Sequence, residues 1–253
     1  MKLVAPLLAA FCLIGCSTEK PVAKGDAPEA PAAPAVFKVD TATAGAISGR
    51  VVFAGKRPAN KRIDLSEDEE CVKLNRRGML DEAVAVNRDG SLRNVFVYIK
   101  SGLEGKNFEP PAEPVVLDQK GCQFAPRVLG MRAGQAIQVT NSDPVTHNVH
   151  PVAQMNREWN QSQAPGDPPI QRKFVRPEVM IRVKCNVHNW MRSWVAVMEH
   201  PYFAVSGEDG TFSMPNVPPG DYTVEAWHET LGTQTAAAKV DASGKVTLEF
   251  AFR

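Results

Sequence analysis

The sequence predicts an all-β protein built from β-sandwiches. Short runs of apolar, β-branched or aromatic residues recur along the chain, and only one segment has a helical pattern. Turn signals such as Asp209-Gly210 and Ser243-Gly244 separate these runs. Many short strands between regular turns are typical of sandwiches, and a hydrophobic fraction of 43% suffices for ordinary globular cores.

The expected strands follow one another in chain order. The segments 222–227 and 246–252 alternate apolar and polar residues cleanly, which predicts strands with one exposed face. The helical exception is 66–74, where Ser66 would cap the first turn and Glu69 would complete a capping box. The full set of expected strands is 47–53, 95–99, 128–131, 136–140, 179–184, 194–198, 222–227 and 246–252.

The N-terminus has the features of an export signal. Lys2 precedes an apolar run that is too short to span a bilayer and suits a signal-peptide core. The run ends in Leu13-Ile14-Gly15-Cys16, which resembles the lipobox of bacterial lipoproteins. The resemblance implies a signal peptide at 1–15 and lipid on Cys16, the first residue of an Ala/Pro-rich tether at 16–45.

These features predict a lipid-anchored protein of the cell envelope, facing the periplasm or the surface. Ser17 follows the lipidated cysteine instead of Asp, which favours the outer membrane. The formal net charge is only +1, so no large field attracts nucleic acid or an anionic membrane. We therefore expect membrane attachment through the anchor and no nucleic-acid partner.

The cysteines fall into classes by position. Cys12 lies in the removed segment, Cys16 would carry lipid, and Cys185 stands in a metal-like motif. Cys71 and Cys122 remain, and because an exported compartment permits a disulfide, we predict that these two cysteines pair. Two separate buried thiols, or Cys122 as a further metal ligand, are the alternatives.

One short segment, together with a histidine upstream, supplies a set of potential metal ligands. Cys185, His188 and Met191 follow the spacing C-x2-H-x2-M, and His147 stands upstream in Thr146-His147-Asn148-Val149-His150. One thiolate, two imidazoles and a weak thioether form the ligand set of a blue-copper centre. Zinc could use the same donors, although a thioether in the set favours copper.

The residues 115–200 resemble a cupredoxin domain, and the motifs above are similar to those of the amicyanins and plastocyanins. The resemblance implies a Greek-key sandwich with one type 1 copper held by His147, Cys185, His188 and Met191. It gives Asn148 the role of tying the first ligand's strand to the cysteine loop. It makes His150 a residue that does not bind metal, and it leaves an exposed edge on His188 beside Trp190.

The segment 207–224 resembles a carboxypeptidase regulatory-like module, a transthyretin-type β-sandwich, through its D-G turn and its P-P-G-x-Y turn. We divide the remainder into an N-terminal β segment at 46–114 and this β module at 201–253. Either the two segments form one sandwich interrupted by the cupredoxin domain, or they stand in series. His228 and Glu229 fit a polar strand end better than a site.

Together these observations predict a type 1 copper lipoprotein that carries single electrons and is not an enzyme, since Met191 fills the position that a substrate needs. Its partner would be a redox protein such as a cytochrome, or a membrane complex. A copper storage or delivery protein of the periplasm is one alternative. A structural envelope lipoprotein that binds zinc or no metal is another. No role follows for His200.

Overall fold

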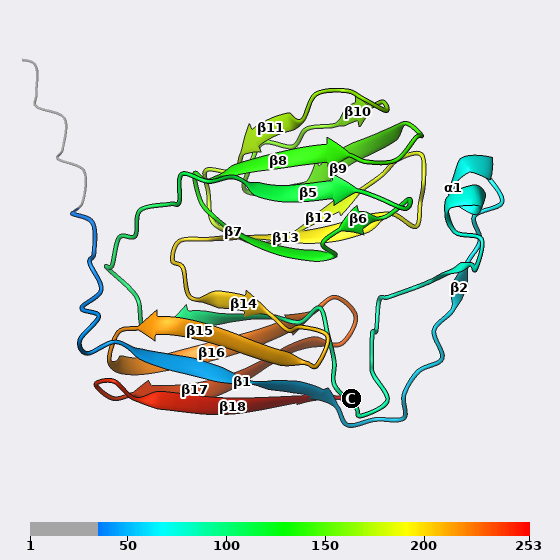
Figure 1. Ribbon diagram of the computed structural model, residues 1–253. Helices are drawn as coiled ribbons and strands as arrows, with labels where there is room; N and C mark the ends of the chain where they lie inside the picture. The colour runs from blue at the N-terminus through cyan, green and yellow to red at the C-terminus, as the bar shows by residue number, and fades with distance from the viewer. Residues whose placement is uncertain (1–34) are drawn as a thin grey trace, which may run out of the picture. The chain divides into compact units, whose positions relative to one another are not determined.

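The computed structural model describes residues 35–253. The predicted signal peptide, Cys16 and the first part of the tether lie outside the described residues. Within the described range, no helix has both the length and the apolar character needed to cross a membrane. The predicted all-β class is confirmed, because the described residues form two β-sandwiches with a single short helix (Figure 1).

The metal-motif sandwich, as we call the part formed by β5–β13, consists of a five-stranded and a four-stranded sheet. The strand orders are β10-β9-β12-β13-β7 and β11-β8-β5-β6, with parallel pairing of β13 to β7 and of β5 to β8. The strands are β5 (Val115–Gln119), β6 (Phe124–Ala125), β7 (Val128–Arg132), β8 (Ala136–Asn141), β9 (His147–Val152), β10 (Gln161–Gln163), β11 (Ile170–Lys173), β12 (Glu178–Lys184) and β13 (Arg192–Met198).

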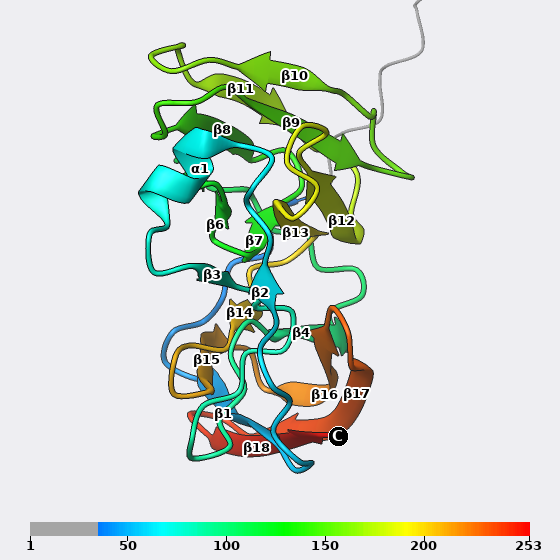
Figure 2. The same cartoon turned by 90° about the vertical axis from the view of Figure 1, so that its right-hand side faces the viewer.

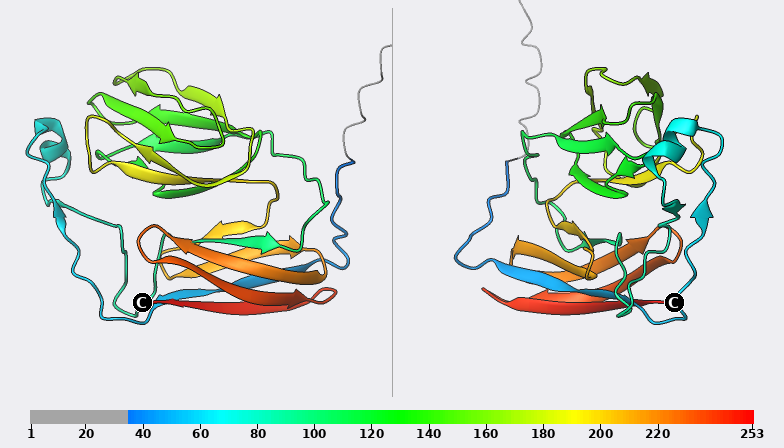
Figure 3. Two further views of the ribbon diagram at one scale, coloured as in Figure 1. Left: turned by 180° about the vertical axis from the view of Figure 1, so that it is seen from behind. Right: turned by 45° about the vertical axis from the view of Figure 1, so that its right-hand side comes forward.

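The second sandwich combines strands from both ends of the chain, with the orders β15-β1-β18 and β14-β4-β16-β17 (Figure 3). The strand β1 pairs in parallel with β18 and antiparallel with β15. Segments from 46–114 and 201–253 thus share one sandwich, and the metal-motif sandwich is inserted between them in sequence. The strands are β1 (Gly45–Phe53), β4 (Phe96–Ser101), β14 (Phe203–Val205), β15 (Thr211–Val217), β16 (Gly220–His228), β17 (Gly232–Val240) and β18 (Lys245–Phe252).

The connection between β1 and β4 carries the only helix among the described residues. It passes through β2 (Arg62–Ile63), α1 (Glu69–Leu74) and β3 (Met79–Leu80), and it reaches the end of the metal-motif sandwich (Figure 2). The predicted Ser66 cap is wrong. Asp68 Oδ1 instead accepts the amide hydrogens of Glu70 and Cys71, so the N-cap lies two residues later than expected.

Each sandwich has its own hydrophobic core, and a third cluster joins the two. In that cluster Trp194 of β13 meets Trp227 of β16, with ring centroids 5.2 Å apart. Beside it Arg127 forms a half-buried ion pair with Glu229, which also accepts a hydrogen bond from Trp194 Nε1 at 3.1 Å. Glu229 thus contributes to packing between the sandwiches.

Candidate metal centre

Three potential donors converge at one end of the metal-motif sandwich. His147 is the first residue of β9, and Cys185 and His188 lie in the loop between β12 and β13. One donor atom from each of the three lies within 4.8 Å of the others. All three side chains are buried, with exposed fractions of 0%, 3% and 2%. Any ion held here is therefore screened from water.

The two imidazoles present the same nitrogen to each other. His147 Nδ1 lies 3.0 Å from His188 Nδ1, and His188 Nδ1 lies 3.8 Å from Cys185 Sγ. Each Nε2 faces a carboxylate, so each Nε2 carries its hydrogen and each Nδ1 of a neutral ring is a bare lone pair. Two facing lone pairs at 3.0 Å repel each other unless a proton or a metal ion lies between them.

Asp143 fixes the first imidazole. Its Oδ2 accepts from His147 Nε2 at 2.8 Å, and its two oxygens also accept the amide hydrogens of Gly121 and Cys122. Burial alone would raise the pKa of Asp143, but these hydrogen bonds outweigh it and lower the pKa. A charged carboxylate therefore orients the ring. Asp143 was not among the predicted site residues, although it stands only four residues before His147.

Asp68 fixes the second imidazole from outside the metal-motif sandwich. Its Oδ2 accepts from His188 Nε2 at 3.0 Å, and this hydrogen bond is the main reason why the pKa of Asp68 is lowered. The predicted exposed edge of His188 is wrong, because Asp68 and α1 cover it and leave 2% of the residue exposed. Asp68 is therefore part of the site and not simply a solvated acidic residue.

A disulfide holds this cover in place. Cys71 of α1 bonds to Cys122, as predicted, and Cys71 Sγ lies 3.8 Å from His188 Nε2. Trp190 packs against the His188 ring with centroids 5.1 Å apart, and its Nε1 donates to the Cys122 carbonyl at 3.0 Å. The three contacts join α1, the turn at Cys122 and the loop after β12.

The surroundings of Cys185 favour the thiolate, which is the form that binds metal. Burial would raise the pKa of Cys185, but hydrogen bonds from His147 and from the amides of His188, Val187 and Asn148 lower it to about 6. For His147, burial would lower the pKa, and the contacts with Asp143 and Cys185 raise it to about 9. Near neutral pH the metal-free site is thus a thiolate beside an imidazolium, whose proton a metal ion would displace.

The remaining predicted site residues adjoin these donors. Met191 is 1% exposed and belongs to the same core cluster as Cys185. The Cys185 amide donates to the Met191 carbonyl, and the Met191 amide to the His188 carbonyl, which closes the loop into a compact turn. Asn148 Oδ1 accepts from the Asn186 amide at 3.0 Å and links β9 to the cysteine loop.

This arrangement fits a copper ion. A thiolate, two neutral imidazoles with converging Nδ1 atoms and a buried thioether match the donor preferences of a type 1 site. The carboxylates on both Nε2 atoms are the outer contacts that fix the tautomer of metal-binding histidines. His147, Cys185 and His188 would hold the ion, with Met191 as the weak fourth donor.

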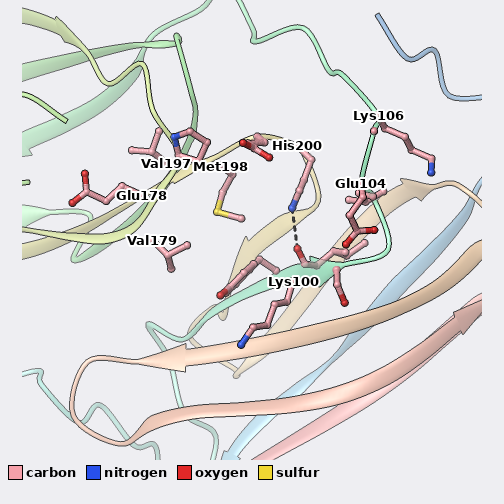
Figure 4. A pocket seen from close by; sticks show the side chains of 15 residues that line it. Lys100, Glu104, Lys106, Glu178, Val179, Val197, Met198 and His200 are labelled. Carbon is pink, nitrogen blue, oxygen red and sulfur yellow. Dashed lines mark hydrogen bonds between the residues drawn. The ribbon is translucent and has the colours of Figure 1, made fainter. Parts of the chain in front are cut away.

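The other three histidines lie outside this cluster of donors. His150 contacts Glu158 and Asn186 on the outer face of β9. His200 lines a cavity of about 460 Å³ between the two sandwiches, where its Nε2 donates to the Ile99 carbonyl (Figure 4). Burial lowers the pKa of both His200 and His228 to about 4, so both are neutral in the folded protein.

No family model matches the chain, and no curated protein matches it. Among solved structures, it is similar to a Cu-containing nitrite reductase from Thermus scotoductus, with 20% identity over 37% of this chain and a TM-score of 0.33. The chain spans 26% of that reductase. A purple cupredoxin from Nitrosopumilus maritimus matches at 19% identity over 33% of this chain and 99% of its own, with a TM-score of 0.29.

An oxidized single-residue mutant of amicyanin matches at 21% identity over 40% of this chain and 98% of its own, with a TM-score of 0.31. The name of the reductase states that it contains copper, the second structure is named a cupredoxin, and the three matches cover at most 40% of this chain. At these identities and TM-scores the likeness carries no argument about function.

Proposed function

We propose that this chain is a lipid-anchored protein of the cell envelope that holds one type 1 copper ion and carries single electrons. The observation that carries the proposal is the convergence of His147 Nδ1, His188 Nδ1 and Cys185 Sγ in a buried site. Bound copper supplies one-electron chemistry by alternating between Cu(I) and Cu(II).

The chain's own residues would make that exchange rapid. Asp143 and Asp68 hold both rings by their Nε2 atoms, and the short turn from Cys185 to Met191 holds the other donors. Donors held this firmly move little when the charge of the ion changes, so little energy is spent on rearrangement. Burial of all the donors also leaves no open position for a substrate, which supports a carrier over an enzyme.

The lipobox-like sequence at Cys16 supports attachment to the envelope membrane, and its Ser17 favours the outer membrane. The partner would be another redox protein, such as a cytochrome, or a membrane complex. A protein that stores or delivers copper would instead need to release the ion, and the disulfide-held cover on His188 opposes release.

Voltammetry of the copper-loaded full chain in the presence of a Cu(I) chelator tests the proposal. A carrier gives a reversible one-electron wave and keeps its copper through many cycles. Rapid loss of Cu(I) to the chelator would contradict the carrier function and favour delivery. A protein that takes up no copper would contradict both and leave the structural lipoprotein.

A further inference from the structure

The path by which electrons leave the site is restricted by the cover on His188. Asp68 lies on the outer nitrogen of that ring, and Cys71 lies 3.8 Å from the same nitrogen. A partner that approached this edge would meet α1 instead of the imidazole. The route must therefore run through another part of the site, and the strand that leads into Cys185 provides one.

The side chains of β12 and β9 alternate between the core and the outer face. Val183 and Cys185 point into the core, whereas Arg182 and Lys184 lie on the outer face. In the register of the sheet Lys184 lies beside His150 of β9. His150 Nδ1 in turn lies 3.2 Å from Asn186 Oδ1, so this face borders Cys185 on both sides.

This side of the sandwich carries an excess of positive charge, which we call the basic flank. None of its five cations forms an ion pair with an acidic side chain of residues 35–253. The residues of the basic flank are Arg157, Arg172, Arg176, Arg182 and Lys184.

The acidic residues nearby are already engaged. Glu158 contacts His150, Asp167 accepts the Ala164 amide hydrogen, and Glu178 accepts three successive backbone amide hydrogens from 154–156. None of these three carboxylates forms an ion pair with an arginine or lysine in the described part of the chain, and the cations of the basic flank outnumber them, so the flank keeps a net positive charge.

Contacts and strand pairing fix the positions of three of these cations. The Arg172 guanidinium lies over the Trp159 ring at 5.5 Å and donates to Gln161 of β10. The Asn156 side chain donates to the Arg176 carbonyl and accepts the Arg176 amide hydrogen. In the sheet, Arg182 of β12 pairs with Val152 of β9. The surface runs from the β11 edge across β9 and β12 to the Cys185 loop.

We propose that the basic flank is the surface on which this protein exchanges electrons, and that its partner is a redox protein with an acidic docking face. The inference rests on the proposed carrier function. One electron crosses in each encounter, and no proton or other atom is transferred. Because the formal net charge of the chain is only +1, steering of an anionic partner must come from a local field of this kind.

A first experiment maps the field without copper. Paramagnetic hexacyanochromate(III) anions are added to the ¹⁵N-labelled, metal-free full chain, and broadening of amide signals is compared with that caused by hexaamminechromium(III) cations. We expect the anion to broaden signals of the basic flank, including Arg182 and Asn186, and the cation to leave them sharp. Broadening by the anion only elsewhere would overturn the proposal.

A second experiment measures electron exchange by stopped flow. Reduced copper protein is oxidised by anionic hexacyanoferrate(III) or by cationic tris(phenanthroline)cobalt(III), each accepting one electron. We expect the anion's rate to fall with added salt and the double variant Arg157→Glu/Arg182→Glu to lose about tenfold at low salt. The matched control Lys239→Glu/Lys245→Glu changes the charge equally on exposed positions of the second sandwich and should change the rate by less than about twofold.

Equal rates for the two double variants would overturn the proposal. A rate with the cationic oxidant that falls as salt is added would also overturn it, because this dependence would place the exchange surface on the acidic residues around α1. Both double variants are first checked for an unchanged copper spectrum. Absence of that spectrum in the unmodified protein would refute the carrier function itself, which the metal-free mapping does not depend on.

Discussion

Replacement of Asp68 by Asn tests separately the two roles of this carboxylate, which are to cap α1 and to orient the His188 ring. In the structure Oδ1 caps α1 by accepting from Glu70 and Cys71, while Oδ2 accepts from His188 Nε2. Asn keeps one acceptor oxygen for the helix and is as good an N-cap as Asp. Its amide NH₂ then faces the His188 N–H, and a donor cannot accept from another donor.

The expected losses follow from these contacts. His188 is 2% exposed, so an unpaired Nε2–H in Asp68→Asn costs about 1–3 kcal/mol of unfolding free energy. Removal of an outer partner of a metal-binding histidine lowers metal affinity by about 10- to 100-fold. Asp68→Ala removes the cap as well and should cost about 1 kcal/mol more in unfolding free energy than Asp68→Asn.

Competition titration with a Cu(II) chelator measures the affinity, and urea unfolding of the metal-free chain measures the stability. Glu67→Gln is the matched control, since it removes a carboxylate from an exposed neighbouring position. The reasoning is refuted if Asp68→Asn binds copper as tightly as Glu67→Gln does. Equal stability of Asp68→Asn and Asp68→Ala would refute the capping role alone.

Three further predictions concern the donors, the disulfide and acid stability. Cys185→Ser abolishes the visible absorption of the copper protein while His150→Ala keeps it, and a colourless His150→Ala would overturn the ligand assignment. Replacement of Cys71 and Cys122 by Ser, which opens a loop of sequence separation 51, lowers the unfolding free energy by about 4 kcal/mol, and unchanged urea denaturation would contradict this. Because burial lowers the pKa of His228 from 6.5 to about 4, its share of stability is present above pH 6.5 and is lost as pH falls toward 4. His228→Gln should reduce the slope of stability against pH in that window by up to about 1.4 kcal/mol per unit, and an unaltered slope in urea titrations would argue against a buried neutral ring.

The part of the site that could be predicted from the sequence is the local part. Cys185, His188 and Met191 lie in one short loop, so their spacing alone brings them together in space. Asp68 has no such signal, because 120 residues separate it from His188 and only tertiary structure brings them into contact. The predicted bond between Cys71 and Cys122 does imply that α1 lies near the site, since it holds α1 beside the turn at Cys122.

In the fold, too, local features could be predicted from the sequence and contacts between distant segments could not. The clean alternation of 246–252 predicted β18 within one residue, whereas β10 consists of three polar residues, Gln161–Gln163, and has no hydrophobic pattern to detect. The parallel partner of β1 also escapes local reasoning, because β18 follows it by almost two hundred residues. Pairing between distant strands depends on the whole chain and not on the pattern of either strand.

The absorption spectrum of the full chain loaded with Cu(II) tests the central claim most directly. A type 1 site should give a strong band at about 600 nm from charge transfer between the Cys185 thiolate and copper, which disappears on addition of ascorbate and returns on reoxidation. A protein that binds Cu(II) without this band would contradict the claim, because the Cys185 thiolate would not be a copper ligand.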